Sequence, residues 1–191
     1  TGIYFDRNKG VKERVPIPIS YIRKVQTLCK EMDDDIRWAV SIASDTGMRL
    51  AEIIGLTLED IVVDNTPYPH LIIQEHPWRR LKNSNSGRLV PLVGSALWAA
   101  RRIKKEVNSN IAFSRYLKGS VCNSNSASAA LNKWLKSYVP SGCSMHSFRH
   151  SIRDRLRNVE CPSDILDQLG GWSSGSVGIN YGRGYNLNIT S

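Results

Sequence analysis

The sequence predicts a mainly α-helical domain that carries a small antiparallel sheet of three strands. Two observations predict this fold class. Apolar residues recur at intervals of three and four, the helical spacing, before residue 55 and again after residue 93. Between these regions, three short runs of β-branched residues are separated by polar turns. We therefore expect two groups of helices with the strands between them.

The first helix is expected after an extended lead-in. The two prolines of the segment 15–18 keep the residues before them out of the helical region, and Ser20 is a suitable N-cap. The segment 33–35, three aspartates, interrupts this helix and caps a second one. The apolar stripe of the first helix is expected to be Tyr21, Val25, Leu28 and Met32, and that of the second Ile36, Ala39, Val40 and Ala43.

A glycine turn at 46–48 ends the second helix, and a third is expected from Leu50. Arg49 therefore stands at a helix start. There it could pair with Glu52, three residues later. It could also join backbone N–H groups in holding an anion. The position alone leaves both interpretations open.

The expected strands are 61–63, 71–73 and 89–92. Turn residues at 64–67 separate the first two. Between the second and third lies the segment 78–88, which has four cations and no acidic residue: Arg79, Arg80, Lys82 and Arg88. Such a hairpin tip is either a solvated loop or one that follows a DNA backbone.

Four helical segments are expected after the strands. Residues 94–107 form a basic helix, and the Ser- and Asn-rich stretch 111–125 is expected to be irregular. A short helix from Pro162 ends at the glycines of 170–171. The clearest amphipathic stripe is expected to be core, and it consists of Ala127, Ala130, Leu131, Trp134, Leu135 and Tyr138.

The helix expected from His146 has two different sides. Phe148, Ile152 and Leu156 repeat every four residues on one side. The other side carries basic residues at i, i+3, i+4 and i+7, namely His146, Arg149, His150 and Arg153. Spacing alone favours a solvated basic face, although a face turned toward a ligand has the same pattern.

The charge balance indicates a polyanionic partner. Lys+Arg 26 against Asp+Glu 17 gives a net charge of +9, which suits nucleic acid or an acidic membrane surface. No stretch is long and apolar enough to span a membrane, and no signal-peptide pattern opens the chain. The four cysteines have no CxxC spacing, which favours a reducing setting. A metal site on Cys143, His146 and His150 stays an alternative.

The segment 143–185, with Arg49 and Lys82, holds the residues that phosphodiester chemistry requires. Arginine stays charged and bonds phosphate oxygens in pairs, which suits Arg49 and Arg149. A tyrosine hydroxyl can attack phosphorus and form a covalent intermediate. Tyr181 and Tyr185 are both candidates for that nucleophile.

Five boxes, in order, resemble those of the tyrosine recombinases, the phage-integrase family. TGMRLAEIIGL at 46–56 is similar to the first arginine box, and SGRLVPL at 86–92 to the end of the β-hairpin. HSFRH at 146–150 is similar to the HxxRH box. LGGW at 169–172 resembles the LGH box with Trp172 in place of histidine, and Tyr181 follows at the family's spacing. The match runs from about residue 17 to 185.

The resemblance implies a recombinase catalytic-domain fold and a role for each box. Arg49 and Arg149 would grip one scissile phosphate, and His146 and Trp172 would complete the pocket by hydrogen bonds. Tyr181 would form a 3′-phosphotyrosine while Lys82 protonates the leaving 5′-oxygen. Glu52 and His150 would support these groups, and no metal or cofactor would be needed. DNA contacts are expected from Arg79, Arg80, Arg88 and Arg153.

The resemblance also implies partners and boundaries. Residues 1–16 would be a lead-in and 17–191 the catalytic domain, without the family's amino-terminal core-binding domain. The partners would be double-stranded DNA and further protomers, four on one DNA complex, with no membrane. The setting would be the bacterial cytoplasm, in a host- or phage-encoded protein at the nucleoid. Three alternatives stay open: a type IB topoisomerase-like enzyme, a DNA-binding module without catalysis, and a metal nuclease.

Overall fold

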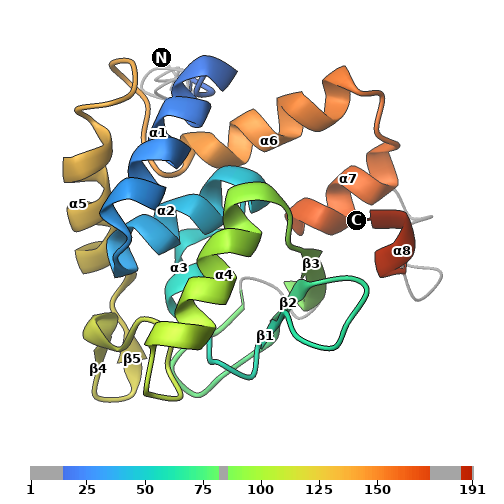
Figure 1. Ribbon diagram of the computed structural model, residues 1–191. Helices are drawn as coiled ribbons and strands as arrows, with labels where there is room; N and C mark the ends of the chain where they lie inside the picture. Colours follow the sequence, from blue (N-terminus) through green and yellow to red (C-terminus); the bar gives the residue numbers. More distant parts are fainter. Residues whose placement is uncertain (1–14, 82–85, 173–185, 191) are drawn as a thin grey trace, which may run out of the picture.

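The structure, a computed structural model, describes residues 15–81, 86–172 and 186–190. It is mostly helical with a small antiparallel sheet, as the sequence predicts. In Figure 1, α2 (Asp35–Thr46) crosses the middle of the molecule, where it contacts α1 (Ile19–Met32), α4 (Gly94–Glu106) and α6 (Ser147–Asn158). These three helices therefore pack around α2.

The ends of α2 are fixed by its sequence. Asp34 is the N-cap, and its carboxylate accepts a hydrogen bond of 3.0 Å from the backbone N–H of Arg37. Gly47 ends the helix in the left-handed conformation, at φ 60°. A side chain at Gly47 would also lie 2.2 Å from Ile152 of α6. Glycine is thus required here for the backbone angle and for the close approach of α6.

The first helix forms in the predicted region, but it begins at Ile19 after Pro18, so Ser20 is not its N-cap. Of the predicted stripe, only Val25 is buried. Tyr21 and Met32 are exposed, whereas Ile22, Val25 and Cys29 are buried. The predicted residues are spaced by four, three and four, which does place them on one side of a helix. The side that packs against the core is turned toward Ile22 and Cys29 instead. The second predicted stripe is confirmed, since Ala39, Val40 and Ala43 are buried in α2.

The sheet has the order β1-β2-β3, and both pairs are antiparallel. The strands are β1 (Ile61–Val62), β2 (His70–Ile73) and β3 (Arg88–Pro91). Leu71, in the central strand, pairs with Ile61 on one side and with Val90 on the other, and all three side chains are buried. One face of the sheet therefore joins the core.

The remaining elements are α3 (Leu50–Ile54), α5 (Ser124–Leu135), α7 (Ser163–Gly170), α8 (Leu187–Thr190), a 3₁₀ turn at Ser114–Tyr116, and the strands β4 (Leu117–Lys118) and β5 (Val121–Cys122). The two short strands form a hairpin inside the stretch 111–125 that was expected to be irregular. In α5 the predicted stripe is confirmed, because Ala127, Leu131 and Leu135 are fully buried.

The extended segment before α1 is attached to α6. The hydroxyl of Ser151 accepts a hydrogen bond of 2.8 Å from the backbone N–H of Ile17, and it lies 3.1 Å from the carbonyl of the same residue. Both residues are buried. In the part of the chain that the structure describes, no helix is both long enough and apolar enough to cross a bilayer.

Candidate active site

The candidate site lies where α3, α6, β3 and the end of α7 meet. The loop after α2 brings in Arg49, the N-cap of α3, and α6 brings in Arg149. The end of α7 is joined to this region by contacts with both α6 and β3. Figure 1 shows α7 turning back from the far end of α6 toward the sheet. Segments far apart in the sequence therefore form one site.

Arg49 is held by a carboxylate on its own helix. Its guanidinium Nη1 donates to Oε1 of Glu52 at 2.7 Å, and its backbone N–H donates to the other carboxylate oxygen at 3.0 Å. Its Nη2 donates to the carbonyl of Gly171 at 3.0 Å. The Arg49 side chain keeps 25% of its surface exposed, so the guanidinium is oriented and still accessible.

Glu52 is buried and carries a second arginine. Arg88, from the start of β3, donates Nη2 to Oε2 at 2.9 Å and Nη1 to Oε1 at 3.2 Å. Burial alone would raise the pKa of Glu52, but the hydrogen bonds from Arg88 and Arg49 outweigh it and lower that pKa below its ordinary value. Glu52 is therefore ionised at neutral pH and shared by two cations.

Arg149 is the most unusual cation of the site, because it is only 6% exposed and has no carboxylate of its own among the described residues. Its Nη1 donates to the carbonyl of Gly47 at 3.0 Å, but in the described part of the chain its Nη2 has no hydrogen-bond partner. Burial first, and then the nearby charge of Arg49, lower the pKa of Arg149 to about 10. A buried, charged N–H group without an acceptor is a place for an anion.

Trp172 covers this arginine. The guanidinium carbon of Arg149 lies 4.4 Å from the centre of the indole ring, and that of Arg153 lies 5.3 Å from it. Arg49 reaches the carbonyl of Gly171 while Arg149 lies over the ring of the next residue. The two guanidinium groups therefore converge on consecutive residues and do not point to separate surfaces.

The two glycines that end α7 make this arrangement possible. A side chain at Gly170 would begin 1.8 Å from the indole ring of Trp172, so the ring folds back over the space that glycine leaves. Gly171 has φ +58°, and a side chain there would lie 2.7 Å from Nη1 of Arg88. The prediction that Gly170-Gly171 ends this helix is confirmed, with Gly171 as the left-handed C-cap.

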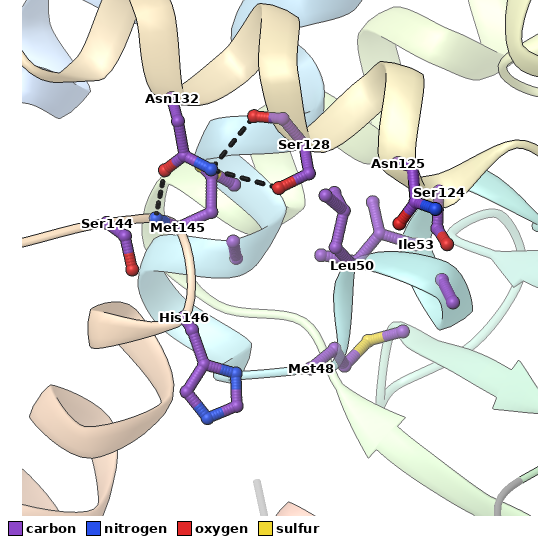
Figure 2. A pocket seen from close by; sticks show the side chains of 12 residues that line it. Met48, Leu50, Ile53, Ser124, Asn125, Ser128, Asn132, Ser144, Met145 and His146 are labelled. Carbon is purple, nitrogen blue, oxygen red and sulfur yellow. Dashed lines mark hydrogen bonds between the residues drawn. The ribbon is translucent and has the colours of Figure 1, made fainter. Parts of the chain in front are cut away.

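His146 lies directly before α6 and is exposed. Its ring centre lies 5.2 Å from that of His150, in an edge-on arrangement. Figure 2 shows His146 and Met48 at one side of a pocket of about 290 Å³, with Asn132 and Ser128 of α5 opposite. The pocket thus opens beside the histidine that was predicted to contact a phosphate.

Two of the four arginines expected to contact DNA are buried instead. Arg79 is 3% exposed, and it donates to the carbonyls of Glu52, at 2.8 Å, and Gln74. The side chain of Arg88 is 5% exposed and occupied by Glu52. Both expectations are wrong, because the two side chains turn inward and bond groups of the core. Arg80 is exposed and Arg153 is partly exposed, as a DNA contact requires.

Lys82, Tyr181 and Tyr185 lie outside the described residues, so their roles stay predictions. Sequence reasoning also missed the connection that Arg88 makes between α3 and α7, through Glu52 and the carbonyl of Leu169. Its signal in the sequence is weak, since Arg88 is one basic residue among four in the hairpin segment. Among the described residues, no group of three His, Cys, Asp or Glu side chains could hold a metal ion.

Comparison with known proteins gives a family match and a similar fold. The family model described as the phage integrase family matches residues 21–186. The fold is similar to that of the Tn1549 transposon integrase solved with circular intermediate DNA, at TM-score 0.66 and 19% identity over 94% of this chain and 66% of that one. No curated protein sequence matches the chain.

Two further solved proteins have this fold. XerA recombinase has a TM-score of 0.62 and 14% identity, over 92% of this chain and 58% of that one. XerH site-specific recombinase, solved in a pre-cleavage complex with its difH substrate, has a TM-score of 0.61 and 15% identity, over 94% and 50%. The chain therefore spans between half and about two-thirds of the length of these proteins.

Proposed function

Because the chain belongs to the phage integrase family, we propose that it is the catalytic part of a site-specific DNA recombinase. It cuts and rejoins DNA strands through a covalent 3′-phosphotyrosine. One observation carries the proposal. Arg49 and Arg149, far apart in the sequence, meet at the end of α7, and Arg149 keeps a buried N–H that has no acceptor among the described residues. A phosphate oxygen supplies that acceptor.

The phosphate is bound by two arginines with different surroundings. Arg49 is held by Glu52 and reaches the phosphate with its accessible face. Arg149 is held by the Gly47 carbonyl and by the Trp172 ring. Positioned cations that meet the charge of the transition state need no reorganisation as the reaction proceeds. His146 supplies a further hydrogen bond from the start of α6, and His150 supports its ring from the next turn.

The proposed reaction steps use residues whose roles are implied by the resemblance to the family. The hydroxyl oxygen of Tyr181 attacks phosphorus and releases its proton to water, the bond from phosphorus to the 5′-oxygen breaks, and Lys82 gives a proton to that oxygen. A 5′-hydroxyl of a partner strand then attacks the phosphotyrosine and releases Tyr181. The phosphodiester energy is kept in the intermediate, so the reaction requires neither metal ion nor nucleotide. Activity that disappears in chelator would contradict this point.

The proposed substrate is duplex DNA, which the protein's net charge of +9 attracts. The similar Tn1549 integrase and XerH structures hold DNA, which supports this partner. Residues 17–191 form the catalytic domain after the lead-in 1–16. Strand exchange needs a second cleaved site, so further protomers join on DNA, four in the complete complex. We place this reaction in the cytoplasm, where bacterial and phage DNA are found.

Covalent capture tests the proposal. The chain is incubated with duplex DNA that carries a nick close to the cleavage site, so that the cut end diffuses away and the adduct accumulates. We expect an adduct whose peptide map identifies Tyr181, and none with Tyr181→Phe, which still binds the DNA. An adduct on Tyr185 would show that Tyr185, and not Tyr181, is the nucleophile. Binding by the parent without any adduct would favour a module that binds DNA without cutting it.

A further inference from the structure

Arg88 is the most completely bonded cation near the site. It makes four hydrogen bonds, two to the carboxylate of Glu52, one to the carbonyl of Leu169 and one to the carbonyl of Ser86. Its side chain is 5% exposed. An arginine has five N–H donors, so little capacity remains for a DNA phosphate.

The bonds of Arg88 connect three parts of the site. Glu52 belongs to α3 and also holds Arg49, while Leu169 is in the last turn of α7, close before Trp172. Arg49 itself donates to Gly171. Two arginines that share one carboxylate therefore hold the carbonyl end of α7, where cations are favourable because of the helix dipole.

Sharing Glu52 also changes how much charge Arg49 has left for a phosphate. With Arg49 alone, the carboxylate and guanidinium would form a neutral pair. With Arg88 bound at both oxygens of Glu52, at 2.9 and 3.2 Å, the cluster of Glu52, Arg49 and Arg88 keeps one net positive charge. The exposed member of that cluster is Arg49, so the surplus charge faces the phosphate.

We propose that Arg88 is a positioning residue of the cleavage reaction. It orders Glu52 and the end of α7, so that Arg49 and Trp172 are in place before DNA arrives, and it does not touch DNA itself. This inference rests on the proposed cleavage function. It replaces the sequence-based expectation that Arg88 contacts the DNA backbone.

The test is Arg88→Lys, which keeps the charge but loses the planar fork that bonds both carboxylate oxygens. We expect adduct formation on nicked DNA to fall about 10- to 100-fold, the scale of a small misplacement of catalytic groups. Affinity for an uncleaved duplex, measured in Tyr181→Phe with and without the lysine change, should stay within about twofold. Its dependence on salt should also be unchanged.

Two results would overturn the inference. If affinity weakens and the salt slope falls by about one, Arg88 contacts a phosphate directly. If adduct formation stays within about twofold of the parent while affinity is also unchanged, Arg88 has no part in the site. If the parent protein itself forms no adduct, the proposed function fails. That result depends on the parent alone and not on the Arg88 variant.

Arg37→Lys is the matched control. Arg37 is also buried and also pairs with an aspartate, Asp34, at 2.9 Å, and it lies over Trp134, on helices that carry none of the proposed catalytic residues. We expect it to lower the thermal midpoint as Arg88→Lys does while adduct formation stays near that of the parent. A comparable loss of adduct in both variants would show that instability alone explains the effect.

A second pair of variants decides the matter if Arg88→Lys does not fold. Gly171→Ala presses a methyl group against the Arg88 guanidinium, 2.7 Å from Nη1, while Gly119→Ala meets nothing within 4 Å. Both glycines have φ +58°, so the backbone strain is the same. We expect adduct formation to fall only in Gly171→Ala. Equal rates in the two variants would overturn the inference.

Discussion

The surroundings of the charged Arg149 side chain make the folded protein less stable. It is buried, one of its N–H groups has no acceptor among the described residues, and the charges of Arg49 and Arg88 lie close enough to lower its pKa. Buried cations of this kind are costly to the folded state unless a partner arrives. A site built to hold a phosphate accepts that cost, because the ligand then provides the missing acceptor.

Replacement of Arg149 by methionine tests this balance. We expect Arg149→Met to lose at least about 10² in cleavage rate, since a charge-stabilising donor is removed. Its thermal midpoint in buffer without sulfate or phosphate should be no lower than that of the parent. Added sulfate should raise the midpoint of the parent but not of the variant, because only the parent offers the buried N–H.

Two controls accompany that measurement. Chloride at equal ionic strength separates anion binding from general screening. Arg101→Met, on the exposed side of α4, should keep both the cleavage rate and the response to sulfate. A marked fall in the midpoint of Arg149→Met would mean that Arg149 stabilises the fold in its own right.

Glu52 gives the site a pH dependence whose sign can be stated. Its pKa in the folded protein is below the ordinary 4.5 because Arg88 and Arg49 bond its ionised form. The resulting stability is fully present above pH 4.5 and is lost as pH falls through the lower, folded value. Glu52→Gln has no such carboxyl group and cannot lose this contribution.

We therefore expect the parent to exceed Glu52→Gln in unfolding free energy at neutral pH, and the difference to narrow as the pH is lowered below 4.5. Urea denaturation of both proteins over this range measures the difference. A gap that stays constant with pH would show that the ionised carboxylate adds nothing to the folded state.

Among the elements, α6 has the most demanding position. Its first turns bring Arg149 to the site, Ile152 against Gly47, and Ser151 to the segment before α1. The hydroxyl of Ser151 meets both the N–H and the carbonyl of Ile17, in a buried position. This contact ties the start of the described chain to the helix that carries Arg149, for which we propose a role in phosphate binding.

Ser151→Ala should cost about 1–3 kcal/mol of unfolding free energy, because the buried polar groups of Ile17 lose their partner. Amide exchange at Ile17 should accelerate more than at Val25, in the middle of α1. Ser126→Ala, at an exposed position in the first turn of α5, is the matched control and should change stability little. If Ser151→Ala is as stable as this control, the lead-in is not held by this contact.

Elements were predictable where their signal is local. The strands at 61–62, 70–73 and 88–91 follow from β-branched runs between turns, and α2 follows from its cap and periodicity. The small hairpin of β4 and β5 was missed, since each strand has only two residues. The buried face of α1 was assigned wrongly, because Tyr21 fits the apolar spacing of the helix but lies on a side that no neighbouring helix covers.

The site was predictable only in part. Arg49, His146, Arg149 and Trp172 were found from local motifs, and the geometry brings Arg49, Arg149 and Trp172 together. The buried roles of Arg79 and Arg88 were not predictable, because their partners come from other elements: Arg88 bonds Glu52, 36 residues away. A basic residue in a hairpin segment looks the same in a sequence whether it faces DNA or a buried carboxylate.

At the scale of the whole molecule, a bundle around α2 brings three distant segments to one place. The net charge of +9 attracts DNA without selecting a phosphate. We propose that the convergence of Arg49 and Arg149 selects one. The central claim is that both guanidinium groups bind the same phosphate.

The most direct measurement is a structure of the Tyr181→Phe protein on an uncleaved duplex. We expect Arg49 and Arg149 to donate hydrogen bonds to the non-bridging oxygens of one phosphate, at about 2.7–2.9 Å, with Trp172 still over Arg149. Arginines that bind different phosphates, or a phosphate bound by neither, would contradict the account.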